Sequence, residues 1–273
     1  MPLPDYHTHT ERCGHASGRP FEYVQAARAA GLLAIGVADH FPLLPSPNPE
    51  LTMDIDDLGD YIAEVESLKE AHPGFVLLGV EADYRPETVT ELAALLAEYP
   101  FDYVIGSVHF LGEWAFDDPQ QIERYAGRDI DRSWAEYLQL VGDAADSGLF
   151  TILGHLDLMK KFGHRPTRSL DRELERLVER VAHAGVLVEI NTAGLHKPVN
   201  EIYPAPHLLR LLHEAGVAIT FGSDAHRPTE VGRDFAQAAA LARLAGYDTY
   251  AMLDPQAGGN RAAIRLRAFE DIA

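Results

Sequence analysis

The stretch Asp5-Tyr6-His7-Thr8-His9-Thr10, almost at the N-terminus, is the element around which the rest of the chain is organised. If these residues form a β-strand, alternate side chains point to the same side, so His7 and His9 can bind one cation together. Two imidazoles are too few for a catalytic metal site, which needs three or more protein donors and an open position. The missing donors must therefore come from elsewhere in the chain.

The length and composition are typical of one folded domain. A chain of 273 residues matches an α/β barrel, which commonly has about 250 residues. Hydrophobic residues make up 47% and charged residues 24%, which is average globular usage and gives no reason to expect disorder. We therefore expect a single domain over residues 1–273.

The net charge of −19 limits the partners of this chain. It repels the phosphate backbone of nucleic acids and the anionic surface of membranes, so neither is expected to bind. A small anionic substrate remains compatible, because bound divalent cations can dominate the local field. The sequence leaves the oligomeric state open.

Cysteine usage and hydropathy predict a soluble, cytoplasmic protein. The single cysteine, Cys13, excludes an intrachain disulfide and suits a reducing compartment. The first residues lack a basic segment followed by an apolar one, and no run approaches the roughly 18 apolar residues that span a bilayer.

Repeated helix, glycine and apolar-run units predict the architecture. Six segments with helical character end at a glycine that is followed by an apolar run, at Gly31, Gly74, Gly148, Gly185, Gly216 and Gly246. Together with the N-terminal strand, the predicted strands cover residues 33–38, 75–80, 103–108, 151–153, 186–190 and 217–221. The predicted helices lie near 20–30, 55–71, 87–98, 132–147, 170–184, 204–215 and 229–245. Strict alternation implies a parallel sheet, and seven units that converge on one site favour a closed barrel.

Strong metal donors stand at the C-terminal ends of six of the seven predicted strands. They are His7 and His9, with His15 in the following loop, then Asp39-His40, Glu81, His109, His155 and Asp224-x-His226. The strands of a barrel open onto one face, so the fold itself would bring these distant residues together. A lone histidine is usually a satisfied polar residue, but seven histidines at one structural position indicate a metal site. Cys13 is better interpreted as a packing residue than as a ligand.

These motifs resemble those of the PHP (polymerase and histidinol phosphatase) superfamily. The resemblance rests on His7-Thr8-His9-Thr10, Ala38-Asp39-His40, Gly79-Val80-Glu81, Gly106-Ser107-Val108-His109, Gly154-His155-Leu156-Asp157 and Gly222-Ser223-Asp224-Ala225-His226. The segments 101–109 and 161–165 look most like those of the histidinol-phosphate phosphatase family.

The resemblance implies a distorted seven-stranded (β/α)7 barrel, similar to a TIM barrel, with three divalent metal ions. One metal would bind His7, His9, Glu81 and Asp224, the second His15, His40 and His226, and the third Glu81, His109 and His155. Glu81 would bridge two metals, since a carboxylate has two oxygens. Imidazole and carboxylate donors suit zinc, iron or manganese.

The expected reaction is hydrolysis of a small phosphomonoester, L-histidinol phosphate, by a hydroxide that the metals generate. Asp39 and Asp157 are candidates for orienting the imidazoles or for protonating the leaving alcohol. Arg165, Lys197 and Arg227 are candidates for binding the phosphate. Glu113, with Asp117, Trp114 and Phe116 in the same long loop, is a candidate for binding the amine and imidazole of the substrate.

Three alternatives remain at this point. A phosphoesterase of the same superfamily could act on a nucleotide or a DNA end, although the acidic charge opposes DNA. A metal-dependent amidohydrolase also begins with His-x-His, but it would need a bridging lysine, and no predicted strand ends in one. A purely structural metal site would close its coordination shell with protein ligands, whereas nine ligands for three metals leave positions open.

Overall fold

Seven parallel strands form the centre of the molecule in a computed structural model that describes residues 2–46, 48–255 and 262–269. Their spatial order follows the chain: β1, β2, β3, β4, β7, β8 and β9. The strands span Pro4–Asp5 (β1), Ala34–Val37 (β2), Val76–Asp83 (β3), Tyr103–Ser107 (β4), Ile152–Leu153 (β7), Leu187–Asn191 (β8) and Ile219–Gly222 (β9).

The two outer strands of this sheet, β1 and β9, meet and close it into a barrel. The amide of Tyr6 donates to the carbonyl of Phe221 at 3.1 Å, and the amide of His9 donates to the carbonyl of Ala225 at 2.9 Å. A parallel bridge between Thr8 and Ala225 continues this seam. The predicted seven-stranded α/β barrel is therefore confirmed.

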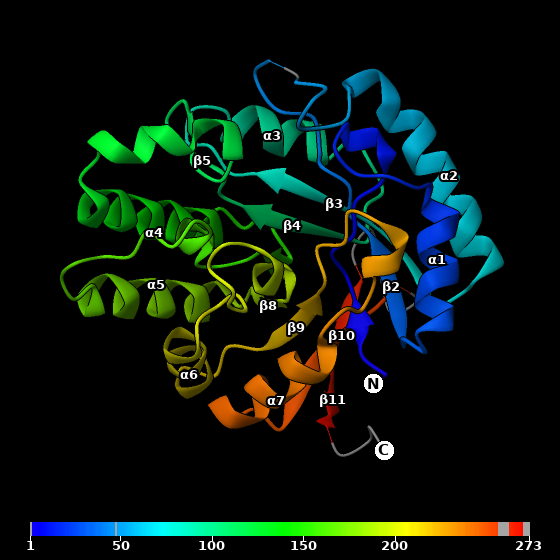
Figure 1. The fold of residues 1–273 in the computed structure, drawn as a ribbon. Helices are drawn as coiled ribbons and strands as arrows, with labels where there is room; N and C mark the ends of the chain where they lie inside the picture. The colour runs from blue at the N-terminus through cyan, green and yellow to red at the C-terminus, as the bar shows by residue number, and fades with distance from the viewer. Residues whose placement is uncertain (1, 47, 256–261, 270–273) are drawn as a thin grey trace.

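Helices surround the strands on the outside of the barrel (Figure 1). They span Pro20–Ala29 (α1), Leu58–Ala71 (α2), Val89–Leu96 (α3), Ile130–Asp146 (α4), Asp171–Ala184 (α5), Pro206–Glu214 (α6) and Phe235–Ala245 (α7). All six glycines predicted to close helices have positive φ, from 66° at Gly185 to 111° at Gly246. The predicted start of the last helix at 229 is wrong: Gly232 and Asp234, with φ of 67° and 62°, interrupt the chain before Phe235.

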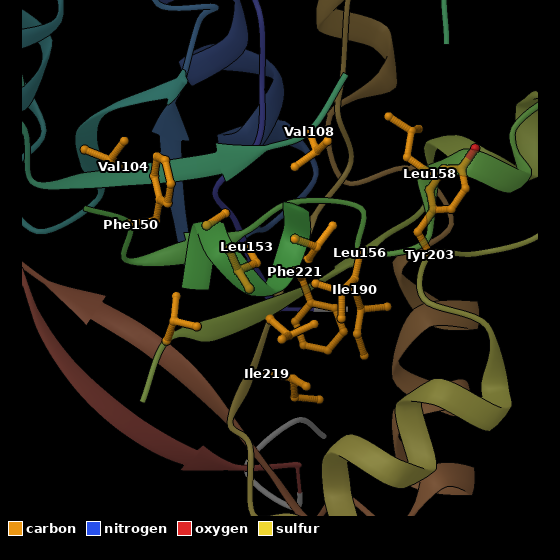
Figure 2. Close-up of a cluster of buried hydrophobic side chains, with 14 of the residues drawn as sticks. Val104, Val108, Phe150, Leu153, Leu156, Leu158, Ile190, Tyr203, Ile219 and Phe221 are labelled. Atoms are coloured by element: carbon orange, nitrogen blue, oxygen red, sulfur yellow. The ribbon is translucent and has the colours of Figure 1, made fainter. Parts of the chain in front are cut away.

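Alternate side chains of the strands pack into two apolar layers. Outward-facing residues of β4, β7, β8 and β9 pack under the helices (Figure 2), and they include Val104, Leu153, Ile190, Ile219 and Phe221. The neighbouring residues in sequence face the barrel interior, among them Leu77, Tyr103, Ile105, Ile152 and Leu187. Because side chains alternate along each strand, the inward-facing apolar residues fill the end of the barrel where the strands begin. Polar residues line the end where the strands finish.

Tyr103 occupies much of the barrel interior, and two glycines make room for it. Its hydroxyl donates to the carbonyl of Tyr6 at 2.7 Å. A Cβ atom at Gly36 would lie 1.8 Å from the Tyr103 hydroxyl oxygen, and one at Gly79 would lie 2.2 Å from its ring. These two positions therefore accept no larger side chain without displacing Tyr103.

Two β-hairpins were missed by the sequence analysis. β10 (Thr249–Asp254) and β11 (Ala263–Ala268) are antiparallel, and the amide of Leu253 donates to the hydroxyl of Tyr6 at 2.9 Å. Ala251, Leu253 and Ala262 join the inner layer, so this hairpin covers the barrel end opposite the candidate metal ligands. β5 (Phe110–Leu111) pairs with β6 (Trp114–Ala115) in the long loop after β4.

Within the part of the chain that the structure describes, the helices are too short or too polar to span a bilayer.

Candidate metal centre

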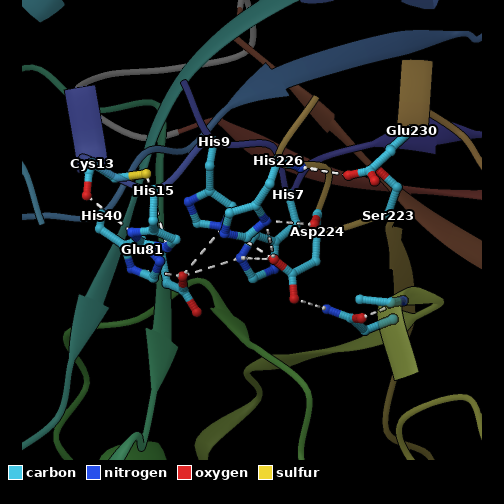
Figure 3. Close-up of polar contacts among 12 residues, drawn as sticks. His7, His9, Cys13, His15, His40, Glu81, Ser223, Asp224, His226 and Glu230 are labelled. Atoms are coloured by element: carbon cyan, nitrogen blue, oxygen red, sulfur yellow. Dashed lines mark hydrogen bonds and ion pairs between the residues drawn. The ribbon is translucent and has the colours of Figure 1, made fainter. Parts of the chain in front are cut away.

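The predicted metal ligands converge at the C-terminal end of the barrel. Figure 3 shows His7, His9, His15, His40, Glu81, Asp224 and His226 close together there. Oε1 of Glu81 lies 3.0 Å from Nε2 of His155 and 3.6 Å from Nε2 of His109. Oε2 lies 3.2 Å from Nε2 of His7 and 3.1 Å from Nδ1 of His40. One carboxylate thus faces ligands from four other strands or strand ends, as a bridging ligand must.

Asp224 completes the group around the N-terminal histidines. Its Oδ1 lies 3.2 Å from Nε2 of His9 and 4.0 Å from Nε2 of His7. Donor atoms of His7, His9 and Asp224 all lie within 4.8 Å of one another, close enough to hold one ion. Asp224 is held here with a φ of 52°, uncommon for a residue other than glycine.

The rings of His15, His40 and His226 lie together beside the first group of ligands. The ring of His15 lies 5.2 Å from that of His40 and 4.9 Å from that of His226, measured between centroids. His9 also stands close to two of them, since its donor atoms group with those of His40 and His226. The nine predicted ligands therefore form one continuous cluster.

Hydrogen bonds at Nδ1 leave Nε2 as the nitrogen that can bind a metal in four of these rings. Nδ1 of His109 donates to Asp83 at 2.9 Å, and Nδ1 of His7 donates to Glu189 at 2.7 Å. Nδ1 of His15 donates to the carbonyl of Cys13, and Nδ1 of His226 donates to that of Asp224, both at 3.0 Å. These bonds orient the rings and direct Nε2 toward the centre.

The unsatisfied atoms of this cluster fit metal ions. Within the described part of the chain, Nε2 of His7, both ring nitrogens of His9 and Nδ1 of His155 are buried without a hydrogen-bond partner. Leaving buried polar atoms unpaired costs free energy, which metal coordination removes. The set of imidazoles and carboxylates fits zinc, iron or manganese.

The charges of the cluster shift the pKa values in opposite directions. Burial opposes a charge on His9, but the carboxylates of Asp224 and Asp39 outweigh it and raise its pKa to about 9. Burial also opposes the charge on His109, whose pKa the carboxylates of Asp83 and Glu81 raise to about 10. Burial and the neighbouring His9 lower the pKa of His226 to about 3. Burial resists ionisation of Glu81, yet His7 and His40 hold its pKa well below the usual value.

The two candidate aspartates lie behind the ligands. Oδ2 of Asp39 accepts hydrogen bonds from the amide and the hydroxyl of Thr10, and its Oδ1 lies 3.8 Å from Nδ1 of His9. Oδ2 of Asp157 pairs with Lys160 at 2.9 Å and accepts from the amide of Ala205 at 2.8 Å. Neither is among the described residues that line the pocket, which disfavours proton donation by either. Asp39 faces His9 and is placed to orient its ring, whereas the side chain of Asp157 contacts Lys160 and Ala205 and no described candidate ligand.

A pocket of about 690 Å³ opens above the cluster. Glu81, His40, His109, His155 and Asp224 form part of its wall. Four cationic side chains also line it: Lys161, Lys197, Arg227 and Arg233. The pocket therefore has candidate metal ligands on its floor and positively charged side chains in its walls.

Comparison with known proteins identifies the family. The sequence matches the family described as PHP domain over residues 5–193, which is more than half of the chain. The chain belongs to the PHP family. The matched region begins at the His-x-His strand and includes all predicted ligands except Asp224 and His226.

Several relatives of this PHP protein are described as histidinol-phosphatases. It is 44% identical over 241 residues to a probable histidinol-phosphatase of Deinococcus radiodurans, covering 86% of this chain and 91% of that relative. It is 29% identical over 258 residues to the histidinol-phosphatase of Bacillus subtilis, covering 85% and 96%. Its fold matches the crystal structure of histidinol phosphate phosphatase from Lactococcus lactis, which is complexed with zinc, L-histidinol and phosphate. The TM-score is 0.80 at 23% identity, and the match covers 96% of this chain and 98% of that one.

The candidate substrate-binding residues of this PHP protein divide into two groups. Lys197 and Arg227 line the pocket as expected. Arg165 does not: it is half-exposed and pairs with Glu201 at 2.5 Å. Glu113 is exposed and also lies outside the pocket lining.

The long loop after β4 contributes Asp117 to the pocket, but not Glu113, Trp114 or Phe116. Trp114 and Phe116 are fully buried in the core, where they pack against Tyr125 and Tyr137, so they are not available to a ligand. Asp117 does line the pocket, paired with Lys161 at 3.0 Å. Lys161 and Arg233 were missed because nothing in the sequence distinguishes a pocket cation from a solvated one.

Glu189 was also missed. It lies fully buried inside the barrel and contacts His7. The available signal was a glutamate within the apolar run Val186-Leu187-Val188-Glu189-Ile190, where a charge is stable only with dedicated partners.

Proposed function

We propose that this protein hydrolyses L-histidinol phosphate to L-histidinol and phosphate at a centre of three divalent metal ions. The observation that carries the proposal is the convergence of nine imidazole and carboxylate groups, Glu81 among them, into one cluster at the floor of a cation-lined pocket. The 44% identity to a probable histidinol-phosphatase over most of both chains supports the same activity.

The ligands divide among three ions in the proposed centre. His7, His9, Glu81 and Asp224 would hold the first, and His15, His40 and His226 the second. The third would be held by Glu81, His109 and His155. Bound ions of zinc, iron or manganese would supply Lewis acidity toward the phosphoryl oxygens and lower the pKa of an attacking water.

The residues of the chain bind and orient the substrate. Lys197 and Arg227 line the pocket, and no ion pair ties either to another described residue, so their charges are available to a phosphate. Asp118, on the loop after β4, also lines the pocket, forms no ion pair with another described residue and would attract the cationic amine of the substrate. Opposite charges within one pocket suit a molecule that carries a phosphate and an amine.

The proposal is tested by measuring phosphate release from L-histidinol phosphate, nucleoside monophosphates and a simple sugar phosphate, with metal analysis of the same sample. We expect the highest kcat/KM for L-histidinol phosphate, loss of activity on removal of metal, and recovery with zinc, iron or manganese. The His9→Gln variant is the background control. A higher kcat/KM for a nucleotide, or full activity in metal-free protein, would contradict the proposal.

A further inference from the structure

Glu189 is a buried carboxylate inside the barrel, beneath the metal ligands. It lies on β8, its side chain is 1% exposed, and its sequence neighbours Val188 and Ile190 face the outer apolar layer. Burial of a carboxylate is unfavourable unless it is fully hydrogen-bonded. The partners of Glu189 therefore indicate why a charge is present at this level of the barrel.

The two oxygens of Glu189 bind separate strands. Oε1 accepts from Nδ1 of His7, which follows β1, at 2.7 Å. Oε2 accepts from the backbone amide of His155, which follows β7, at 3.0 Å, and from Nδ2 of Asn191 at 3.0 Å. Nδ2 of Asn191 also lies 3.4 Å from Oδ2 of Asp224, which follows β9. One carboxylate is thus connected to three candidate metal ligands.

The surrounding backbone leaves space for this carboxylate. A Cβ atom at Gly222 would lie 1.7 Å from Oε1 of Glu189 and 2.6 Å from Cβ of His7. No other residue fits at Gly222 while Glu189 and His7 keep their positions. His155 has a φ of 22°, unusual for a residue other than glycine, and the hydrogen bond that its backbone amide donates to Oε2 of Glu189 holds it there.

We propose that Glu189 is a positioning residue that sets the tautomer and orientation of His7 and fixes the backbone of His155, so that both rings are ready to bind metal. Accepting the Nδ1 proton of His7 leaves Nε2 unprotonated and increases its strength as a donor. This inference rests on the metal centre of the proposed function and adds a residue that coordinates no ion itself.

A purely structural role makes a different prediction. If Glu189 only satisfied polar groups of the barrel, its replacement would lower stability and leave metal affinity unchanged. Asp102 provides the matched control, because it is a buried carboxylate at the opposite end of the barrel that accepts from the amide of Leu78 at 2.8 Å and pairs with Lys69 at 2.9 Å. It contacts no candidate ligand.

The test compares zinc binding by the wild type, Glu189→Gln and Asp102→Asn, using chelator competition on metal-free protein and circular dichroism to verify folding. We expect Glu189→Gln to bind zinc about 10- to 100-fold more weakly and Asp102→Asn to bind within threefold of the wild type. Equal zinc affinity in a folded Glu189→Gln protein would overturn the role of Glu189. Failure of the wild type to bind zinc would instead overturn the metal centre and the proposed function.

A second measurement does not depend on the variant being folded. In the zinc-loaded wild type, nitrogen-15 NMR of the histidine rings reports which nitrogen of His7 carries the proton. We expect a proton on Nδ1 and metal on Nε2. The reverse assignment would overturn the proposal, because Glu189 would then have no proton to accept.

Discussion

The carboxylate of Glu81 contacts His155 through one oxygen, at 3.0 Å, and leaves its other oxygen to face His7 and His40. This division predicts that Glu81→Gln loses metal at more than one position, because an amide offers one weaker donor oxygen. Phosphate release should fall on the order of 10³-fold, the equivalent of several kcal/mol of lost metal assistance. Metal content by mass spectrometry and kcat on L-histidinol phosphate measure both effects.

The control for Glu81 is Asp83→Asn on the same strand. Among the described candidate ligands, Asp83 contacts His109 alone, through Nδ1 at 2.9 Å. We expect a smaller loss, about 10- to 100-fold in metal affinity. If both variants retained the same metal content, Glu81 would not be a bridging ligand.

Metal binding should release protons at neutral pH. In the metal-free protein the pKa of His9 is about 9 and that of His109 about 10, so both rings are protonated at pH 7.5. A ligating imidazole must lose its proton, so metal affinity should increase as the pH rises from about 6.5 toward 9. Calorimetry of zinc binding in buffers of different ionisation enthalpy counts the released protons, and a count of zero at pH 7.5 contradicts this prediction.

The same shifts give the metal-free protein a definite pH dependence of stability. A histidine whose pKa is raised on folding stabilises the folded state fully below the unfolded value of about 6.5, and this contribution is lost as the pH rises through the folded value. The Tm of metal-free protein should therefore fall between about pH 6.5 and 10. Zinc-loaded protein serves as the control and should show a smaller change over that range.

Phosphate binding should depend on the cations in the pocket. Lys197→Ala and Arg227→Ala are expected to raise KM for L-histidinol phosphate roughly tenfold each, the scale of one lost charge-assisted hydrogen bond. Arg165→Ala should change KM little, since Arg165 is paired with Glu201 outside the pocket. Steady-state kinetics of the three variants decide the matter, and an increase confined to Arg165→Ala would restore that residue to the substrate site.

The packing around Tyr103 predicts an intolerant glycine. Gly36→Ala would place a Cβ atom 1.8 Å from the Tyr103 hydroxyl, and overpacking of this kind costs about 1 to 3 kcal/mol or more. Gly59 is exposed on α2, and no atom lies within 4 Å of an added Cβ. Gly59→Ala should therefore stabilise the folded protein by about 0.5 kcal/mol. Urea denaturation of both metal-free variants gives the comparison; a Gly36→Ala protein as stable as Gly59→Ala would refute the packing argument.

The barrel was predictable because its signals are local and repeated. Each glycine with positive φ, followed by an apolar run, marks a helix end and the next buried strand. Gly246 provides this signal before β10, but β11 has none: Arg265 and Arg267 interrupt its apolar pattern, and it is stabilised by pairing with β10 rather than by burial. The interruption at Gly232 and Asp234 was equally invisible in an otherwise helical pattern.

The convergence of the candidate metal ligands was predictable for a related reason, and the places of Arg165 and Glu113 were not. A ligand at a strand end is positioned by the barrel, so the sequence position alone fixes its place. Arg165 is positioned by its ion pair with Glu201, which no periodicity encodes, and Glu113 lies exposed in another loop. Trp114 and Phe116 belong to the same loop, yet packing against Tyr125 and Tyr137 draws them into the core.

The seam between β1 and β9 has a consequence for how the protein is made. Residues 1–10 leave the ribosome long before residues 219–226, so His7 and His9 are synthesised without their partner Asp224. In the proposed centre these three residues share one ion, which could be held only once the last barrel strand has docked against the first. Retention of that ion would therefore report that translation and folding are complete, and ribosome-bound chains that end before β9 should lack it.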